Sequence, residues 1–177
     1  LRLNCIGVGF RIYPGSEYNY KLIEQACNLF REAKEAGLIT VLWSYARGSI
    51  SKKGETAINI ISYAAHMACL CGAHIVKVKL PTSYLEDDAT KDAFIKNNIK
   101  IDTAVDRVKV VKRSCFNGRR IVVFSGGEAK DDSELLKEVK AIKEGGGNGS
   151  IVGRNCFQRS KKEALALLDQ MFSIYKN

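Results

Sequence analysis

The sequence contains no apolar run long enough to cross a membrane, since no window approaches the ~18 consecutive apolar residues that a membrane helix needs. Its opening segment, LRLNCIGVGF, also lacks the charged start and long apolar stretch of a signal peptide. These absences predict a cytoplasmic protein without a membrane partner. With 177 residues, 46% of them hydrophobic, the chain has the size and composition of one globular domain, which excludes intrinsic disorder and fibrous repeats.

Metal-binding patterns are also missing. The six cysteines include no CxxC pair, so neither a zinc knuckle nor a thioredoxin-type motif is predicted. They are scattered through apolar runs, which is typical of reduced, buried thiols in a cytosolic protein. His66 and His74 have no ligand partner at suitable spacing, so the sequence predicts structural histidines and no metal.

Lysine and arginine outnumber aspartate and glutamate by 28 to 19, and the net charge of +9 favours anionic partners. Nucleic-acid binding would require these basic residues to cluster. They do not: lysines and glutamates alternate over residues 134–144, which is typical of a solvated helix face. We therefore predict no nucleic-acid partner, and a small phosphorylated substrate fits the charge equally well.

Short apolar runs rich in β-branched residues alternate with helical patterns along the chain. The runs predict strands over 5–10, 39–43, 73–80, 120–124 and 150–152. Helices are predicted over 18–36, 56–71, 131–143 and 160–175, with Ser133 and Ser160 as N-caps. Strand and helix alternate at roughly 30-residue intervals, which predicts right-handed βαβ units and a parallel sheet.

Two architectures fit this alternation, an open doubly wound sheet and a closed (β/α)8 TIM barrel. The doubly wound dinucleotide fold needs a GxGxxG turn between strand and helix, whereas GGGNGS at 145–150 precedes a strand. Side-chain alternation favours the barrel, because Trp43 and Tyr45 share one face of the second strand and Lys77 and Lys79 share one face of the third.

A closed barrel takes eight such units, and a fragment of five would leave two unpaired parallel edges. We therefore expect residues 1–177 to form a single domain that supplies the last five units, strands 4 to 8. Strands 1 to 3 would lie upstream of this chain.

Lys77 and Lys79 lie two residues apart in HIVKVKL, so both amines emerge on one side of a strand. In a site shielded by Trp43, two neighbouring cations would disfavour protonation of one of them. A neutral lysine amine is the nucleophile that forms a Schiff base with a carbonyl. On these two residues alone, an equal alternative is that both lysines extend from the strand end into water.

Trp43, Tyr45 and Arg47 in WSYARG end the neighbouring strand with the same alternation. A tyrosine phenol can relay a proton, an arginine can hold a phosphate, and the indole can wall a pocket. Alternatively, Trp43 and Tyr45 could simply fill a layer of the barrel interior.

Glycines follow the last two predicted strands. Their backbone N–H groups can donate to a phosphate, and a helix that begins directly after them adds the positive end of its dipole. TIM barrels frequently bind phosphate at the loops after strands 7 and 8. The proposed strand numbering places both segments in those loops. The candidate phosphate-binding residues are Ser125, Gly126, Gly127, Gly153 and Arg154.

Six segments occur in an order that resembles the archaeal/bacterial-type class I fructose-bisphosphate aldolases: CIGVGF, IYPGSE, WSYARG, HIVKVKLP, RRIVVFSGG and GNGSIVGRNCFQR. The resemblance covers nearly the whole chain. It implies a (β/α)8 barrel in large homo-oligomers, often decamers, which needs no metal or other cofactor. It also implies reversible cleavage of fructose 1,6-bisphosphate to dihydroxyacetone phosphate and glyceraldehyde 3-phosphate in glycolysis and gluconeogenesis.

The resemblance also implies roles for individual residues. Lys77, the first lysine of the K-x-K pair, matches the Schiff-base lysine, and Lys79 beside it would act electrostatically. Tyr45 matches the acid/base tyrosine and Trp43 the tryptophan beside it. The serine and glycines at 125–127, with Gly153 and Arg154, match the phosphate loops.

The chain departs from the family at three places. Ala46 replaces the proline of WSYPRG, and Arg11 stands where the family often has threonine, which adds a charge able to alter sugar specificity. The family's aspartate in a D-H-G motif is not in this chain. Two alternatives therefore stay open: a related Schiff-base sugar-phosphate lyase or transaldolase-like synthase, and an inactive partial-barrel assembly subunit.

Overall fold

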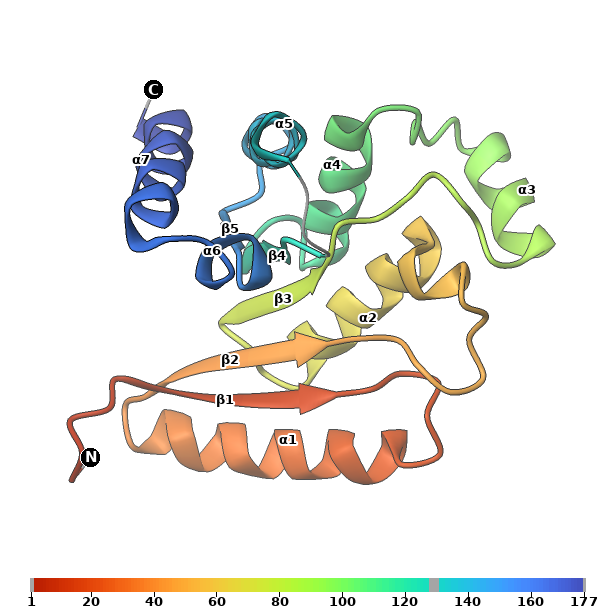
Figure 1. Ribbon diagram of the computed structural model, residues 1–177. Coiled ribbons are helices and arrows are strands. Elements are labelled where there is room, and N and C mark those ends of the chain that lie inside the picture. Colours follow the sequence, from red (N-terminus) through yellow and green to blue (C-terminus); the bar gives the residue numbers. More distant parts are fainter. Residues whose placement is uncertain (1, 128–130, 177) are drawn as a thin grey trace.

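The computed structural model describes residues 2–127 and 131–176. Within them, five strands form one parallel sheet whose spatial order follows the chain (Figure 1). The strands are β1 (Gly7–Ile12), β2 (Ile39–Ser44), β3 (Ile75–Lys79), β4 (Ile121–Ser125) and β5 (Gly149–Ile151). Each predicted strand is confirmed, with bounds that differ by at most two residues.

Helices connect the strands. They are α1 (Asn19–Glu35), α2 (Ile58–Leu70) after the short 3-10 helix η1 (Gly54–Thr56), α3 (Asp88–Lys96), α4 (Ala104–Ser114), α5 (Asp132–Glu144), α6 (Arg154–Phe157) and α7 (Lys161–Lys176). The four predicted helices are confirmed, and the sequence analysis missed η1, α3, α4 and α6. For α4 a signal existed, because Thr103 and Asp106 form a capping box at its start.

The sheet is covered by helices on one face. Its strands run in chain order without a reversal, and right-handed crossovers then place successive helices on the same side. α1 packs on β1 and β2, and α2 packs on β2 and β3 (Figure 1). A doubly wound sheet reverses its strand order and carries helices on both faces, and the five described strands show neither feature.

Burial alternates along the strands as the sequence predicted. Leu42, Val76 and Phe124 face the helices and are fully buried, whereas Trp43 and Lys77 lie on the other face and are only half-buried. The main core gathers under α1, α2 and α4, and a smaller cluster of Leu135, Val139, Leu167 and Met171 joins α5 to α7. Each large, fully buried side chain contributes about 1.5–3 kcal/mol.

Two local predictions were wrong. Ser133 is not an N-cap, because α5 begins at Asp132 and the side chain of Asp131 accepts the N–H of Glu134 at 2.9 Å. Cys5 and Cys27 are exposed rather than buried, since their positions near β1 and on α1 face solvent. Ser160 does act as a cap, because its hydroxyl accepts the N–H of Glu163 at 3.4 Å. In the described ranges, no helix combines the length and the apolar character needed to cross a bilayer.

Candidate active site

The register of the strands aligns side chains in rows on the face of the sheet that the helices do not cover, which we call the inner face. Arg11 on β1 pairs with Trp43 on β2, Trp43 pairs with Lys77 on β3, and Lys77 pairs with Val123 on β4. Paired residues of parallel strands point to the same face, so these four side chains form one row across the sheet. Two residues nearer the carboxyl ends of the strands, Lys79 on β3 pairs with Ser125 on β4.

Lys77 therefore stands between an indole and a valine. Burial lowers the pKa of Lys77 below its ordinary value, because an apolar surrounding disfavours the charged ammonium. The expected direction of the shift is confirmed, but its expected cause is not. Burial is responsible rather than the charge of Lys79, which is compensated by a carboxylate.

That carboxylate belongs to Glu55 on η1, a residue that the sequence analysis missed. Glu55 is only 9% exposed. Its Oε2 accepts hydrogen bonds from Lys79 Nζ at 2.8 Å and from an Arg47 guanidinium nitrogen at 2.7 Å, and Lys52 Nζ lies 3.5 Å from Oε1. The hydrogen bond from Lys79 is the main reason why the pKa of Glu55 is lowered. The signal in the sequence was a single carboxylate within the basic loop 47–56.

The pairing with Glu55 changes the interpretation of Arg47. From the sequence, this guanidinium was expected to bind a phosphate. In the structure it donates to the carboxylate of Glu55 and to the carbonyl oxygen of Ala46, the latter at 2.8 Å. Arg47, Lys79 and Lys52 surround the one carboxylate of Glu55, so positive charge remains in excess here. Arg47 also lines the cavity that the phosphate loops line, and its contact with a phosphate stays a prediction.

Tyr45 directly follows β2 and approaches Ser125 at the end of β4. Burial raises the pKa of the Tyr45 phenol, and the neighbouring Ser125 side chain, which interacts with it, offsets part of this effect. The phenol consequently stays protonated at neutral pH, the state in which it can donate a proton.

The two predicted phosphate loops lie together. Arg154 donates a hydrogen bond to the carbonyl oxygen of Gly127 at 3.0 Å, and the buried side chain of Asn155 donates to that of Gly126 at 3.3 Å. Gly127 has a φ of +67°, a conformation that favours glycine, and a Cβ at Gly126 would come within 2.9 Å of Val152. Gly153 has a φ of −112°, so its backbone does not require glycine.

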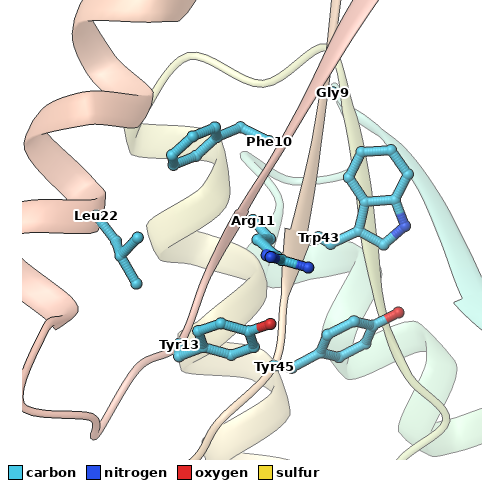
Figure 2. Close-up of a pocket in the computed structure, with 7 residues that line it drawn as sticks. All are labelled: Gly9, Phe10, Arg11, Tyr13, Leu22, Trp43 and Tyr45. Atoms are coloured by element: carbon cyan, nitrogen blue, oxygen red, sulfur yellow. The ribbon is translucent and has the colours of Figure 1, made fainter.

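These groups surround two cavities. One, of about 910 Å³, is lined by members of the Glu55 cluster and of the phosphate loops, including Tyr45, Arg47, Lys79, Ser125, Gly126, Gly127 and Arg154. The other, of about 590 Å³, is lined by Gly9, Phe10, Arg11, Tyr13, Leu22, Trp43 and Tyr45 (Figure 2). Tyr45 lines both, whereas Lys77 and Gly153 are not among the lining residues of either.

The indole of Trp43 lies against Gly9 (Figure 2). A Cβ on Gly9 would collide with the six-membered part of that ring. Because Gly9 has no side chain, the indole of Trp43 can lie against β1 on the same face as Lys77.

Both histidines make contacts that explain them structurally. His66 Nδ1 lies 2.8 Å from the carbonyl oxygen of Ser114, and His74 Nδ1 accepts the N–H of Thr40 at 3.1 Å. Across residues 2–127 and 131–176, no group of three or more His, Cys, Asp or Glu side chains is arranged to hold a metal ion.

A methyl group at Gly9 should displace the indole. Trp43 is the only tryptophan of the chain, so its fluorescence reports on this position directly. In Gly9→Ala we expect the emission maximum to shift to longer wavelength, because the ring moves towards water. Gly149→Ala is the matched control, since a Cβ there meets its nearest neighbour at an ordinary 3.7 Å. An unchanged emission in Gly9→Ala would contradict the packing described.

Loss of the Glu55 charge should weaken the fold in a pH-dependent way. Because the pKa of Glu55 is lowered in the folded state, its stabilisation is present above the ordinary glutamate pKa and is lost as the pH falls through the lowered value. We expect Glu55→Gln to reduce the free energy of unfolding by about 1–3 kcal/mol at neutral pH. The difference from the unmodified protein should shrink in acid.

Denaturant titrations at several pH values measure this difference. Glu35→Gln, on the exposed surface of α1, is the matched control. A loss of equal size at neutral and acidic pH would show that the ion pairs of Glu55 are not its cause.

The chain resembles known proteins over most of its length. Residues 4–159 match the model of the DeoC/LacD family aldolases. The chain is 32% identical over 173 residues to the fructose-bisphosphate aldolase/6-deoxy-5-ketofructose 1-phosphate synthase of Methanocaldococcus jannaschii, an alignment that covers 97% of this chain and 49% of that protein.

Two solved structures are similar as well. One is the Schiff base-forming fructose-1,6-bisphosphate aldolase whose reaction intermediates were analysed structurally. It superposes on this chain with a TM-score of 0.77 at 29% sequence identity, and the alignment covers 98% of this chain and 59% of that one. An archaeal fructose-1,6-bisphosphate aldolase with its catalytic lysine covalently bound to the carbinolamine intermediate has a TM-score of 0.75 and 30% identity, over 97% of this chain and 60% of its own.

The chain spans about half the length of the curated relatives that it matches. Within that span, the match to the family model extends over all five strands, and the solved aldolases share the arrangement of the parallel sheet and its helices. The chain belongs to the DeoC/LacD family of aldolases.

Proposed function

We propose that the protein is a class I fructose-bisphosphate aldolase that cleaves fructose 1,6-bisphosphate through a Schiff base on Lys77. The observation that carries this proposal is a half-buried lysine with a lowered pKa, one strand away from a tyrosine whose pKa is raised. Burial thus favours the neutral form of Lys77 and the protonated form of Tyr45, which are the forms that a Schiff-base nucleophile and a general acid require. The names of the relatives at about 32% identity support the same reaction.

We also propose that β1 to β5 occupy the positions of strands 4 to 8 in a (β/α)8 barrel. Their unbroken sequential order and the helices on a single face support this assignment. So does the share of the solved aldolase chain that the alignment covers, 59%. The homo-oligomeric state stays a prediction from the resemblance, and the cytoplasmic location stays a prediction from the composition of the sequence.

In the proposed mechanism the neutral amine of Lys77 adds to the C2 ketone of the substrate, and loss of water produces an iminium ion. A base removes the proton of the C4 hydroxyl, the C3–C4 bond breaks, and its electron pair flows into the iminium to form an enamine. Glyceraldehyde 3-phosphate leaves. Tyr45 would protonate the enamine carbon, after which hydrolysis releases dihydroxyacetone phosphate and restores the free lysine.

The phosphate on C1 would be held by the loops after β4 and β5. The backbone N–H of Gly126 donates to the carbonyl oxygen of Ile151 at 3.2 Å, so the close approach would come from the backbone of Gly127. The exposed guanidinium of Arg154 adds a charge-assisted contact. Lys79 and Arg47, bound to Glu55 in the same cavity, supply the remaining positive charge.

A transaldolase-like synthase or a related sugar-phosphate lyase is the second candidate. Arg11, which lines the cavity beside Trp43 and Tyr45, is the observation that favours it, because a charge there changes which sugar fits. Kinetics with a panel of phosphorylated and unphosphorylated ketoses and aldehydes would separate the two candidates.

Borohydride reduction in the presence of dihydroxyacetone phosphate should attach the ligand covalently to Lys77. Because only the neutral amine attacks, the rate of attachment should rise with pH around a midpoint below the ordinary lysine pKa of 10.5. Peptide mass spectrometry locates the adduct. Lys79→Met is the control in which the adduct should persist, and an adduct on Lys79 would overturn the assignment.

Removal of the Tyr45 hydroxyl should slow turnover without preventing imine formation. For Tyr45→Phe we expect kcat to fall on the order of 10²–10⁴-fold, the contribution of one general acid–base group. The borohydride adduct on Lys77 should still form. Tyr63→Phe, on the exposed side of α2, serves as the control. A loss below tenfold would assign the proton transfer to another group.

A further inference from the structure

We propose that Arg11 binds a second phosphate, at the end of the substrate opposite to the Gly126–Gly127 loop, and so selects ketoses that are phosphorylated at both ends. The inference rests on the proposed aldolase function. It adds a binding site at β1, a strand to which the mechanism above assigns no role.

The order of the strands sets the direction of the substrate. The phosphate loops follow β4 and β5, Lys77 lies on β3, and Tyr45 follows β2. A ketose with one phosphate on these loops and its carbonyl carbon on Lys77 therefore extends towards β1. The bond to be broken then lies near Tyr45, and the far end reaches the row position of Arg11.

The lengths agree with this placement. Neighbouring strands lie about 4.8 Å apart, so β1 and β3 are separated by roughly 10 Å. The chain from C2 to the phosphorus on C6 contains six bonds of about 1.5 Å, which span roughly 8 Å when extended. The flexible side chain of Arg11 readily closes the remaining gap.

The surroundings of Arg11 suit an anion. Its guanidinium lies between the indole of Trp43 and the phenol rings of Tyr13 and Tyr45 (Figure 2). Tyr45 also lines the cavity of the phosphate loops, so the two cavities are neighbours with Tyr45 between them. A substrate with a phosphate at each end would have to pass Tyr45 to reach both.

The charge of Arg11 is not compensated within the structure. Of the carboxylates in the part of the chain that the structure describes, none forms an ion pair with Arg11, whereas Glu55 binds both Arg47 and Lys79. Arg11 is also exposed on the inner face. An unpaired guanidinium presents several N–H donors in a planar fork, which matches the oxygen atoms of a phosphate.

Two substrates test this inference, fructose 1,6-bisphosphate and fructose 1-phosphate, which share the carbonyl and the C1 phosphate and differ in the C6 phosphate. Arg11→Met retains an unbranched side chain without the charge. We expect its KM for the bisphosphate to rise about 10- to 100-fold, on the scale of one charge-assisted contact. Its KM for fructose 1-phosphate should change by less than about twofold, and Arg11→Lys should restore part of the preference.

Three controls accompany this experiment. Arg31→Met removes a positive charge from α1, outside both cavities, and should leave the ratio of the two KM values unchanged. Arg154→Met should raise KM for both substrates, because both carry the C1 phosphate. Dihydroxyacetone phosphate lacks the distal phosphate, so its borohydride adduct should form normally in Arg11→Met, which also shows that the variant is folded.

Equal KM changes on both substrates in Arg11→Met would overturn the inference. So would a changed pH dependence of adduct formation with an unchanged KM ratio, since Arg11 would then act on the protonation of Lys77 in the same row. The proposed aldolase function has its own test: it would be refuted if the unmodified protein formed no borohydride adduct with dihydroxyacetone phosphate. A normal adduct with an unaltered substrate preference in Arg11→Met would instead refute the role of Arg11 alone.

Discussion

The parallel register between β2 and β3 is the constraint on which the site depends. It sets Trp43 beside Lys77, and the register between β3 and β4 sets Val123 on the other side. A shift by one residue would turn Lys77 towards α2 and replace it with a valine, because side chains alternate along a strand. The fully buried row of Val76 and Val78 under α2 opposes such a shift. Core packing on one face of the sheet therefore determines the chemistry on the other.

The two neighbouring lysines differ in their surroundings rather than in their strand. Lys77 lies in an apolar row, where burial lowers its pKa. Lys79 lies two residues nearer the carboxyl end of β3, and its Nζ forms an ion pair with Oε2 of Glu55 at 2.8 Å. A short 3-10 helix that follows the loop after β2 supplies that carboxylate. The same strand thus carries, two residues apart, a lysine whose neutral form is favoured by burial and a lysine whose charge is compensated by a carboxylate.

Some of this arrangement could be predicted from local patterns. Apolar, β-branched runs identified the strands, and the alternation of side chains identified the face that carries Trp43, Tyr45, Lys77 and Lys79. The helices α3 and α4 were missed because the segment 88–114 is largely polar. α4 nevertheless places Val108 and Val111 at helical spacing behind its capping box, and tertiary contacts with α2 and α5 bury them. Ser133 was mistaken for a cap because Asp131, a residue equally suited to capping, stands two positions earlier.

The parallel α/β architecture and the strand ends at which polar groups gather could be read from the sequence, since both follow from periodicity along the chain. Which group each charge meets depends instead on the folded arrangement. Glu55 reaches Lys79 from 24 residues away in the chain, and Arg154 reaches Gly127 across 27. The cause of the lowered pKa of Lys77 was likewise decided by packing. Distances of this kind are set by the way in which separate strands and loops converge, and no local pattern encodes them.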